Sequence, residues 1–245
     1  MDSTESTNDK ITPEKTSKVS TDILIWTIIA IQLIVGVYGF IVLPDRVPIH
    51  WGANGQVNGY GPKWVDTFLF PLISVGIYLL LRLLITAGPR LGGREVTATN
   101  LQVAKIVITG ITLFMLIIQL VVIAVAMGIG LDITMVYTLA LSILFIFIGN
   151  YMGRMQRNFW MGIRTPWTLT NATVWERTHR LGGWLFVAVG LIGIVCSFIP
   201  VLRLWGVVVP IIAVTIFLFI YSYVCYQQQT RGEREPLSPP FNEGG

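Results

Sequence analysis

The sequence predicts an all-α membrane protein with six transmembrane helices and both termini in the cytoplasm. Of its 245 residues, 53% are hydrophobic and only 12% are charged, and the mean hydropathy is +0.69. Soluble domains usually carry about 25% charged residues, so the composition excludes an ordinary soluble protein. Long runs without Asp, Glu, Lys or Arg give the number of spans, and the placement of Lys and Arg gives their orientation.

Six apolar segments can each form one span, since a helix needs about 20 residues to cross the hydrocarbon core. The segment 106–153 contains one charged residue, Asp132, and is too long for a single span. We divide it at Gly128-Ile129-Gly130-Leu131-Asp132, because glycine allows the backbone to reverse tightly. The expected spans are approximately 23–43, 64–85, 106–128, 133–152, 181–202 and 204–226.

Lys and Arg residues are concentrated on one side of these spans. Thirteen of the 17 lie in the two tails and in the loops after the second and fourth spans, whereas the loops on the other side hold three. Because cytoplasmic loops carry the excess of positive charge, both termini are expected inside the cell. Residues 1–22 and 227–245 have little apolar content, and we expect them to be disordered tails on either side of the membrane domain, 23–226.

The loop expected outside the cell, 44–63, is rich in turn-forming residues. It contains three prolines and two Asn-Gly pairs, at 54–55 and 58–59, and Asn-Gly is a strong signal for a hairpin turn. We therefore expect an ordered loop that forms a small hairpin on the outer face. Candidate contacts for a ligand or partner are the following residues of this loop: His50, Trp51, Asn54, Gly55 and Tyr60.

Other roles are open to these residues. Trp51, Tyr60 and Trp64 could belong to the aromatic belt at the membrane surface instead of a binding site. A metal at His50 would have only Asp45 as a further strong ligand in the loop, and no paired His or Cys spacing supports it. We therefore expect neither a metal nor a cofactor.

The loop expected in the cytoplasm, 152–180, is basic and aromatic. It carries five arginines and a single acid, Glu176, and the segment 150–184 holds four of the eight tryptophans. Arginines that meet anionic lipid headgroups and tryptophans that lie in the interface would account for this composition. They would not account for the order of the residues.

That order predicts a sharp turn followed by a short helix. Gly162 permits a change of direction, and Thr165 is pushed toward extended backbone by Pro166. Caps at 168–171 would start a helix that runs to about residue 180, and Gly182-Gly183 would end it before the fifth span. On this helix Trp175 and His179 are four residues apart and share one face.

Two roles are open to Arg164 at the turn. It could bind helix-end carbonyls and so lock the loop, or it could bind an anionic group of a ligand or partner. His179 could titrate near neutral pH or could simply be hydrogen-bonded. The candidate residues of the inner-loop motif are Asn150, Arg157, Asn158, Gly162, Arg164, Thr165, Pro166, Trp167, Trp175, Thr178, His179 and Arg180.

No catalytic residues are expected. The two histidines, His50 and His179, are predicted on opposite faces of the membrane, so they cannot share a metal or a triad. No Ser, Cys or paired-carboxylate arrangement stands out, and the centres of the spans lack acids. An enzyme is therefore the least supported class of function.

Two stretches of the sequence resemble a known family. Asn150, Asn158, GIRTPWTL at 162–169 and VWERTHRLGG at 174–183 resemble the signature of the SdpI family of bacterial membrane proteins. The stretch LPDRVPIHWGANGQVNGYGPK at 43–63 resembles the small domain of unknown function that precedes this signature in many members. The family is named for an immunity protein that protects cells from a secreted, membrane-active peptide and recruits a transcriptional repressor to the membrane.

The resemblance implies an immunity and sensor protein of the cell membrane. Its expected partners are membrane lipids, a peptide toxin outside and a cytoplasmic repressor inside, with no direct contact to nucleic acid. A transporter of small molecules or lipids is the alternative, because an inner loop can gate a cavity between helices. A membrane enzyme acting on lipid or peptide is a second alternative.

Overall fold

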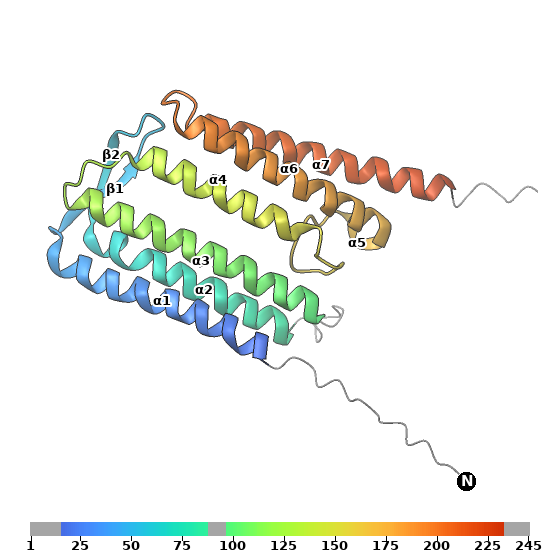
Figure 1. Cartoon of the computed structure of the whole chain (residues 1–245), viewed down its shortest axis with the longest axis horizontal. Helices are drawn as coiled ribbons and strands as arrows, with labels where there is room; N and C mark the ends of the chain where they lie inside the picture. Colours follow the sequence, from blue (N-terminus) through green and yellow to red (C-terminus); the bar gives the residue numbers. More distant parts are fainter. Residues whose placement is uncertain (1–15, 88–96, 233–245) are drawn as a thin grey trace, which may run out of the picture.

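The computed structural model describes residues 16–87 and 97–232, which form seven helices and one two-stranded sheet (Figure 1). Six of these helices, all except α5, are long and apolar enough to cross a membrane, so the predicted six-span, all-α fold is confirmed. The elements in order are α1 (Thr16–Val42), β1 (Arg46–Trp51), β2 (Val57–Pro62), α2 (Lys63–Ala87), α3 (Ala98–Ala126), α4 (Ile133–Met152), α5 (Pro166–Thr170), α6 (Ala172–Ser197) and α7 (Trp205–Gly232).

The six long helices run side by side and have two distinct ends (Figure 1). The start of α1 and the end of α7 lie at one end of the bundle, which we call the terminal end, and the β-hairpin lies at the other, the hairpin end. Helices α1, α2 and α3 pack on one another as a first group, and α4, α6 and α7 pack as a second group. Contact between α3 and α4 joins the two groups.

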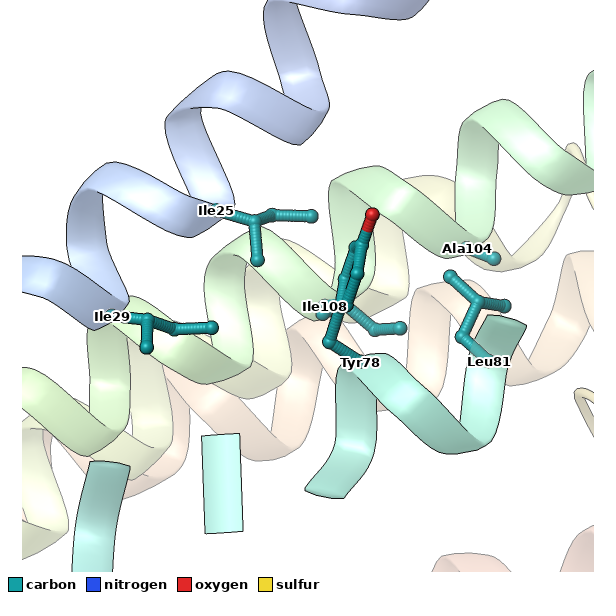
Figure 2. Close-up of a cluster of buried hydrophobic side chains, with 6 residues drawn as sticks. All are labelled: Ile25, Ile29, Tyr78, Leu81, Ala104 and Ile108. Atoms are coloured by element: carbon teal, nitrogen blue, oxygen red, sulfur yellow. The ribbon is translucent and has the colours of Figure 1, made fainter. Parts of the chain in front are cut away.

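The first group combines an apolar core with one polar junction. Figure 2 shows the core, to which each helix contributes two side chains: Ile25, Ile29, Tyr78, Leu81, Ala104 and Ile108. At the junction, the buried Gln119 of α3 donates from Nε2 to the carbonyls of Gln32 (3.0 Å) and Thr67 (2.9 Å). Side-chain hydrogen bonds of this kind hold helices together in lipid, so Gln119 ties α1 and α2 to α3.

The second group is packed through glycines. A Cβ atom added to Gly183 of α6 would lie 2.7 Å from the carbonyl oxygen of Gly149 of α4, and one added to Gly149 would lie 2.6 Å from that of Gly183. Small residues let the backbones of two membrane helices approach this closely. The prediction that Gly182-Gly183 would end a helix is therefore wrong, because α6 continues through the pair and uses its missing side chains for packing.

The reversal between α3 and α4 is formed as predicted. Gly128 has a φ of +87° and donates to the carbonyl of Val125, while Ile129 donates to the carbonyl of Ala124 at 3.0 Å. This pair of bonds is a Schellman motif, which satisfies the last carbonyls of a helix. Asp132 then caps α4 by accepting the N–H of Met135 at 3.0 Å.

Helices α1 and α7 extend further than expected at the terminal end. Helix α1 begins at Thr16, and Asp22 in its second turn pairs with Lys105 of α3 at 2.6 Å. Helix α7 runs to Gly232, so the disordered tail expected from residue 227 is wrong for its first six residues. Glutamine is a good helix former, and Thr230 donates back to the carbonyl of Tyr226 at 3.1 Å. The rest of both predicted tails lies outside the described residues.

The predicted hairpin at 44–63 is present as the antiparallel pair β1 and β2. Its tip contains the expected turn at Asn54-Gly55, where Gly55 has a φ of +78°. The second Asn-Gly pair, at 58–59, does not form the expected turn and lies in β2. Gly59 faces His50 across the sheet, where a Cβ would lie 2.9 Å from the Cβ of His50, so this glycine makes room for the partner strand.

The hairpin rests on both groups of helices. Val47 is fully buried in a cluster with Leu43 and Ile123, which fixes β1 to the first group. The tip reaches the second group, since a Cβ on Gly55 would lie 3.0 Å from the hydroxyl of Thr134 in the first turn of α4. The hairpin thus bridges the two groups at one end of the bundle.

Candidate functional site

The sequence-predicted candidates lie in two places, at opposite ends of the bundle. At the hairpin end, His50 of β1 contacts Asn58 of β2 through Nδ1 and Oδ1. Trp51 is half-buried against the α3–α4 contact, whereas Tyr60 is exposed. Asn54 accepts the N–H of Gln56 at 3.2 Å, which closes the tip.

A cavity of about 340 Å³ lies beside the hairpin tip. The tip contributes Ala53 and Asn54, and the remaining wall comes from the start of α4, the loop between α6 and α7 and the first residue of α7: Thr134, Pro200, Val201, Arg203 and Trp205. We call these seven residues the hairpin-end pocket. Of the predicted outer-loop candidates, the pocket includes only Asn54.

Arg203 places a guanidinium group, ion-paired with Asp132, in the wall of the hairpin-end pocket. Its guanidinium pairs with Asp132, the N-cap of α4, and donates from Nε to the carbonyl of Ser197 at 3.0 Å. Sequence reasoning missed this residue and its neighbour Trp205. The available signal was charge, because Arg203 and Asp132 are opposite charges in two loops on the same side of the predicted membrane.

At the terminal end, side chains of the segment after α4 form hydrogen bonds with backbone groups of the same segment. Asn158 accepts the N–H groups of Trp160 (3.0 Å) and Met161 (2.7 Å), which forms a local turn. Arg157 donates to the carbonyl of Thr170 at 2.9 Å, and Arg164 donates to the carbonyl of Phe159. Both arginines therefore bridge the loop, and the acceptor of Arg164 is a loop carbonyl.

The GIRTPWTL segment is anchored to α7 through a short helix. Thr165 caps α5 in a reciprocal capping box with Thr168, and Pro166 occupies the first turn, where a proline costs no hydrogen bond. Trp167 donates from Nε1 to Ser222 of α7, and its ring packs edge-on against two aromatic rings of α7, Phe219 and Tyr223. The loop is therefore held at a defined position on the bundle.

His179 holds the turn to α6. Its side chain is 1% exposed, Nδ1 donates to the carbonyl of Trp175 at 2.9 Å, and Nε2 accepts the N–H of Ile163 at 2.9 Å. The ring also stacks on that of Trp175, with centroids 3.9 Å apart. Because accepting at Nε2 requires the neutral ring, this geometry favours the hydrogen-bonded role over a titrating switch.

Gly162 makes this contact possible. Its φ is +101°, and a Cβ at this position would overlap Nε2 of His179. The predicted change of direction at Gly162 is therefore present. Residues 172–180, which were expected to be a separate short helix in the loop, are the first turns of α6.

The remaining inner-loop candidates do not join this cluster through hydrogen bonds. Asn150 donates to the carbonyl of Ile146 within α4 at 2.9 Å. Thr178 is fully buried, and its hydroxyl has no hydrogen-bond partner among the described residues. Arg180 is exposed on α6.

Six apolar helices with an ordered hairpin at one end and a hydrogen-bonded basic loop at the other define a multi-pass membrane protein. The sequence matches the SdpI/YfhL protein family over residues 154–224 and a domain of unknown function, DUF1648, over residues 27–75. The resemblance predicted from the two motifs is thus confirmed. The second match covers most of α1, the hairpin and the first half of α2, and the first covers the inner loop, α6 and most of α7.

The chain is also similar to a curated protein along almost its whole length. Immunity protein SdpI of Bacillus subtilis (strain 168) is 22% identical over 207 residues, which cover 84% of this chain and 96% of the relative. No solved structure shows significant similarity to the chain.

Proposed function

We propose that this protein is a membrane immunity protein that protects its cell from a secreted, membrane-active peptide. The observation that carries the proposal is the similarity to an immunity protein, which spans 96% of that relative and so includes both ends of the bundle. The two family matches support it, because each falls on one of the two places where candidate residues gather.

The hairpin-end pocket is the proposed contact for the peptide. Its walls come from an ordered hairpin, a helix start and a loop, so little conformational freedom is lost when a ligand binds. Trp205 is 54% exposed in this pocket, beside the guanidinium of Arg203, which is ion-paired with Asp132. An exposed tryptophan beside a fixed guanidinium suits a peptide with apolar and acidic or carbonyl groups.

The terminal end is the proposed contact for a cytoplasmic repressor. The guanidinium of Arg164 is exposed and donates to a single carbonyl, so most of its five N–H donors are available to a partner. The turn that carries it is fixed to α6 by His179 and to α7 by Trp167. A charged group held in one place suits recognition of an acidic surface.

Protection is tested by expressing this protein alone in Bacillus subtilis cells that lack their own SdpI and exposing them to toxin-producing cells. We expect survival to be restored, and killing at normal protein abundance would contradict the proposal. Ala53→Trp should abolish survival because it fills the hairpin-end pocket. Gln56→Trp, at an exposed position of the same hairpin outside the pocket, is the matched control and should leave survival unchanged.

The relay is tested separately with Arg164→Lys and Arg164→Ala. Lysine keeps the charge but loses the planar fork of donors, so we expect both variants to reduce toxin-dependent recruitment of the repressor to membranes while abundance stays normal. Loss of abundance in both variants would assign Arg164 a purely structural role. Full recruitment in both would remove Arg164 from the relay.

A further inference from the structure

A second charged cavity lies between α6 and α7, apart from the hydrogen-bonded cluster around Arg164 and His179 and from the hairpin-end pocket. Its volume is about 450 Å³, and five residues line it: Arg177, Arg180, Leu181 and Trp184 of α6, and Tyr221 of α7. We call it the α6–α7 cavity. It combines two cations with aromatic and aliphatic side chains on the outer surface of the bundle.

The two arginines of this cavity are available for a ligand. They are three residues apart on α6 and therefore face the same side of the helix. Both are exposed, and within the described ranges neither has an ion pair or a hydrogen bond. In this they differ from Arg157 and Arg164, which donate to backbone carbonyls of the loop.

The position of the cavity along α6 matches the membrane interface. The 26 residues of α6 give a helix about 39 Å long, which exceeds a hydrocarbon core of about 30 Å. Arg180 lies about 12 Å from its start, and Trp184, one turn further on, is 72% exposed. Tryptophan gathers at the level of lipid headgroups, so the arginines lie where lipid phosphates are found.

We propose that the α6–α7 cavity binds the phosphate group of an anionic phospholipid, with an acyl chain along Leu181 and Trp184. Guanidinium groups bind phosphate oxygens in pairs of parallel hydrogen bonds, and two of them can hold one phosphate between them. The apolar part of the lining favours a lipid over free phosphate, which shares the same chemistry. The proposal does not depend on the immunity function, because the cavity shares no residue with the hairpin-end pocket or with the contacts of Arg164, and of the predicted site residues it includes only Arg180.

The test uses the purified full-length protein in lipid nanodiscs that contain either phosphatidylglycerol or phosphatidylcholine, brominated on the acyl chains. Bromine quenches nearby tryptophans, and the quenching lost in Trp184→Phe is the signal from the cavity. We expect brominated phosphatidylglycerol to quench Trp184 more strongly than brominated phosphatidylcholine does. The double variant Arg177→Gln with Arg180→Gln should weaken this preference for phosphatidylglycerol by roughly fivefold for each guanidinium removed.

A matched control removes two exposed charges at the same end of the bundle but outside the cavity. Arg82→Gln with Arg231→Gln should keep the preference for phosphatidylglycerol. Equal loss in both double variants would show general attraction to charge and overturn the proposal, as would full retention in Arg177→Gln with Arg180→Gln. If inorganic phosphate changes the Trp184 signal in phosphatidylcholine discs with the same arginine dependence, the ligand is free phosphate and the lipid is excluded.

Discussion

The substitution Gly162→Ala should destabilise the protein strongly, although it adds a single methyl group to an exposed turn. Two costs combine at this position. The backbone has a φ of +101°, and the new Cβ would overlap Nε2 of His179. The methyl group therefore cannot be accommodated unless the histidine ring moves or the turn changes its conformation.

The size of the effect follows from the two costs. A residue with a side chain at positive φ costs about 1–2 kcal/mol. Displacing His179 breaks the bonds to Ile163 and Trp175 and leaves buried polar groups unpaired, which costs about 1–3 kcal/mol. The expected loss of folding free energy is therefore about 2–5 kcal/mol.

Two other glycines separate these contributions. Gly128 has a φ of +87° with nothing within 4 Å of an added Cβ, so Gly128→Ala should show the backbone cost alone. Gly153 has a φ of −67°, and its Cβ would meet only Arg180 Cα at 3.9 Å, so Gly153→Ala should be close to neutral. Thermal unfolding in detergent should rank the apparent Tm values as wild type and Gly153→Ala, then Gly128→Ala, then Gly162→Ala.

A double-mutant cycle identifies the contact responsible. His179→Ala removes the ring that the new methyl group would strike, so the double variant should lose less stability than the sum of the two single variants, by at least about 1 kcal/mol. Additivity within about 0.5 kcal/mol would refute the proposed collision. A Gly162→Ala variant as stable as Gly128→Ala would refute it as well.

Three further outcomes are expected. Gly183→Val should lower the yield of folded, monodisperse protein because it forces α6 away from α4, whereas Gly76→Val, with nothing within 4 Å of its Cβ, should not. In a variant without native cysteines, Asn54→Cys should react with an impermeant maleimide added to whole cells, and Arg231→Cys should react only after lysis; the reverse pattern would contradict cytoplasmic termini. Trp167→Phe removes the hydrogen bond to α7 but keeps the ring, and should lower the apparent Tm by a few degrees, about 1 kcal/mol.

The number of helices was predictable because lipid sets their length. The segment 106–153, whose single charged residue is Asp132, is too long for one span and must form two, and Asp132 with the two glycines before it marks the division. The hairpin tip was predictable for a similar local reason, since Asn-Gly is a strong signal for a hairpin turn. In each case a few adjacent residues determine the outcome.

The errors arise where distant residues determine the structure. Gly182-Gly183 resembles a helix end by the rules for soluble helices, but its partner is Gly149 on another helix, which local sequence does not reveal. Asn58-Gly59 resembles a turn, but it lies in β2, where Gly59 pairs with His50 of β1 and its missing side chain leaves room for the histidine. The hairpin-end pocket escaped prediction for the same reason, because Arg203 and Asp132 are 71 residues apart.

The bridging position of the hairpin has a mechanical consequence. Because its base is fixed to one helix group and its tip meets the other, a change in the angle between the groups must alter the distance between these two attachment points. Because α6 is about 39 Å long, a small tilt at one of its ends moves the other end by a larger distance. A tilt of roughly 3° at the hairpin end would displace the far end by about 2 Å, which is comparable to the helix shifts that carry signals through other proteins. A displacement at the hairpin end would thus reach the terminal end without any segment changing its secondary structure.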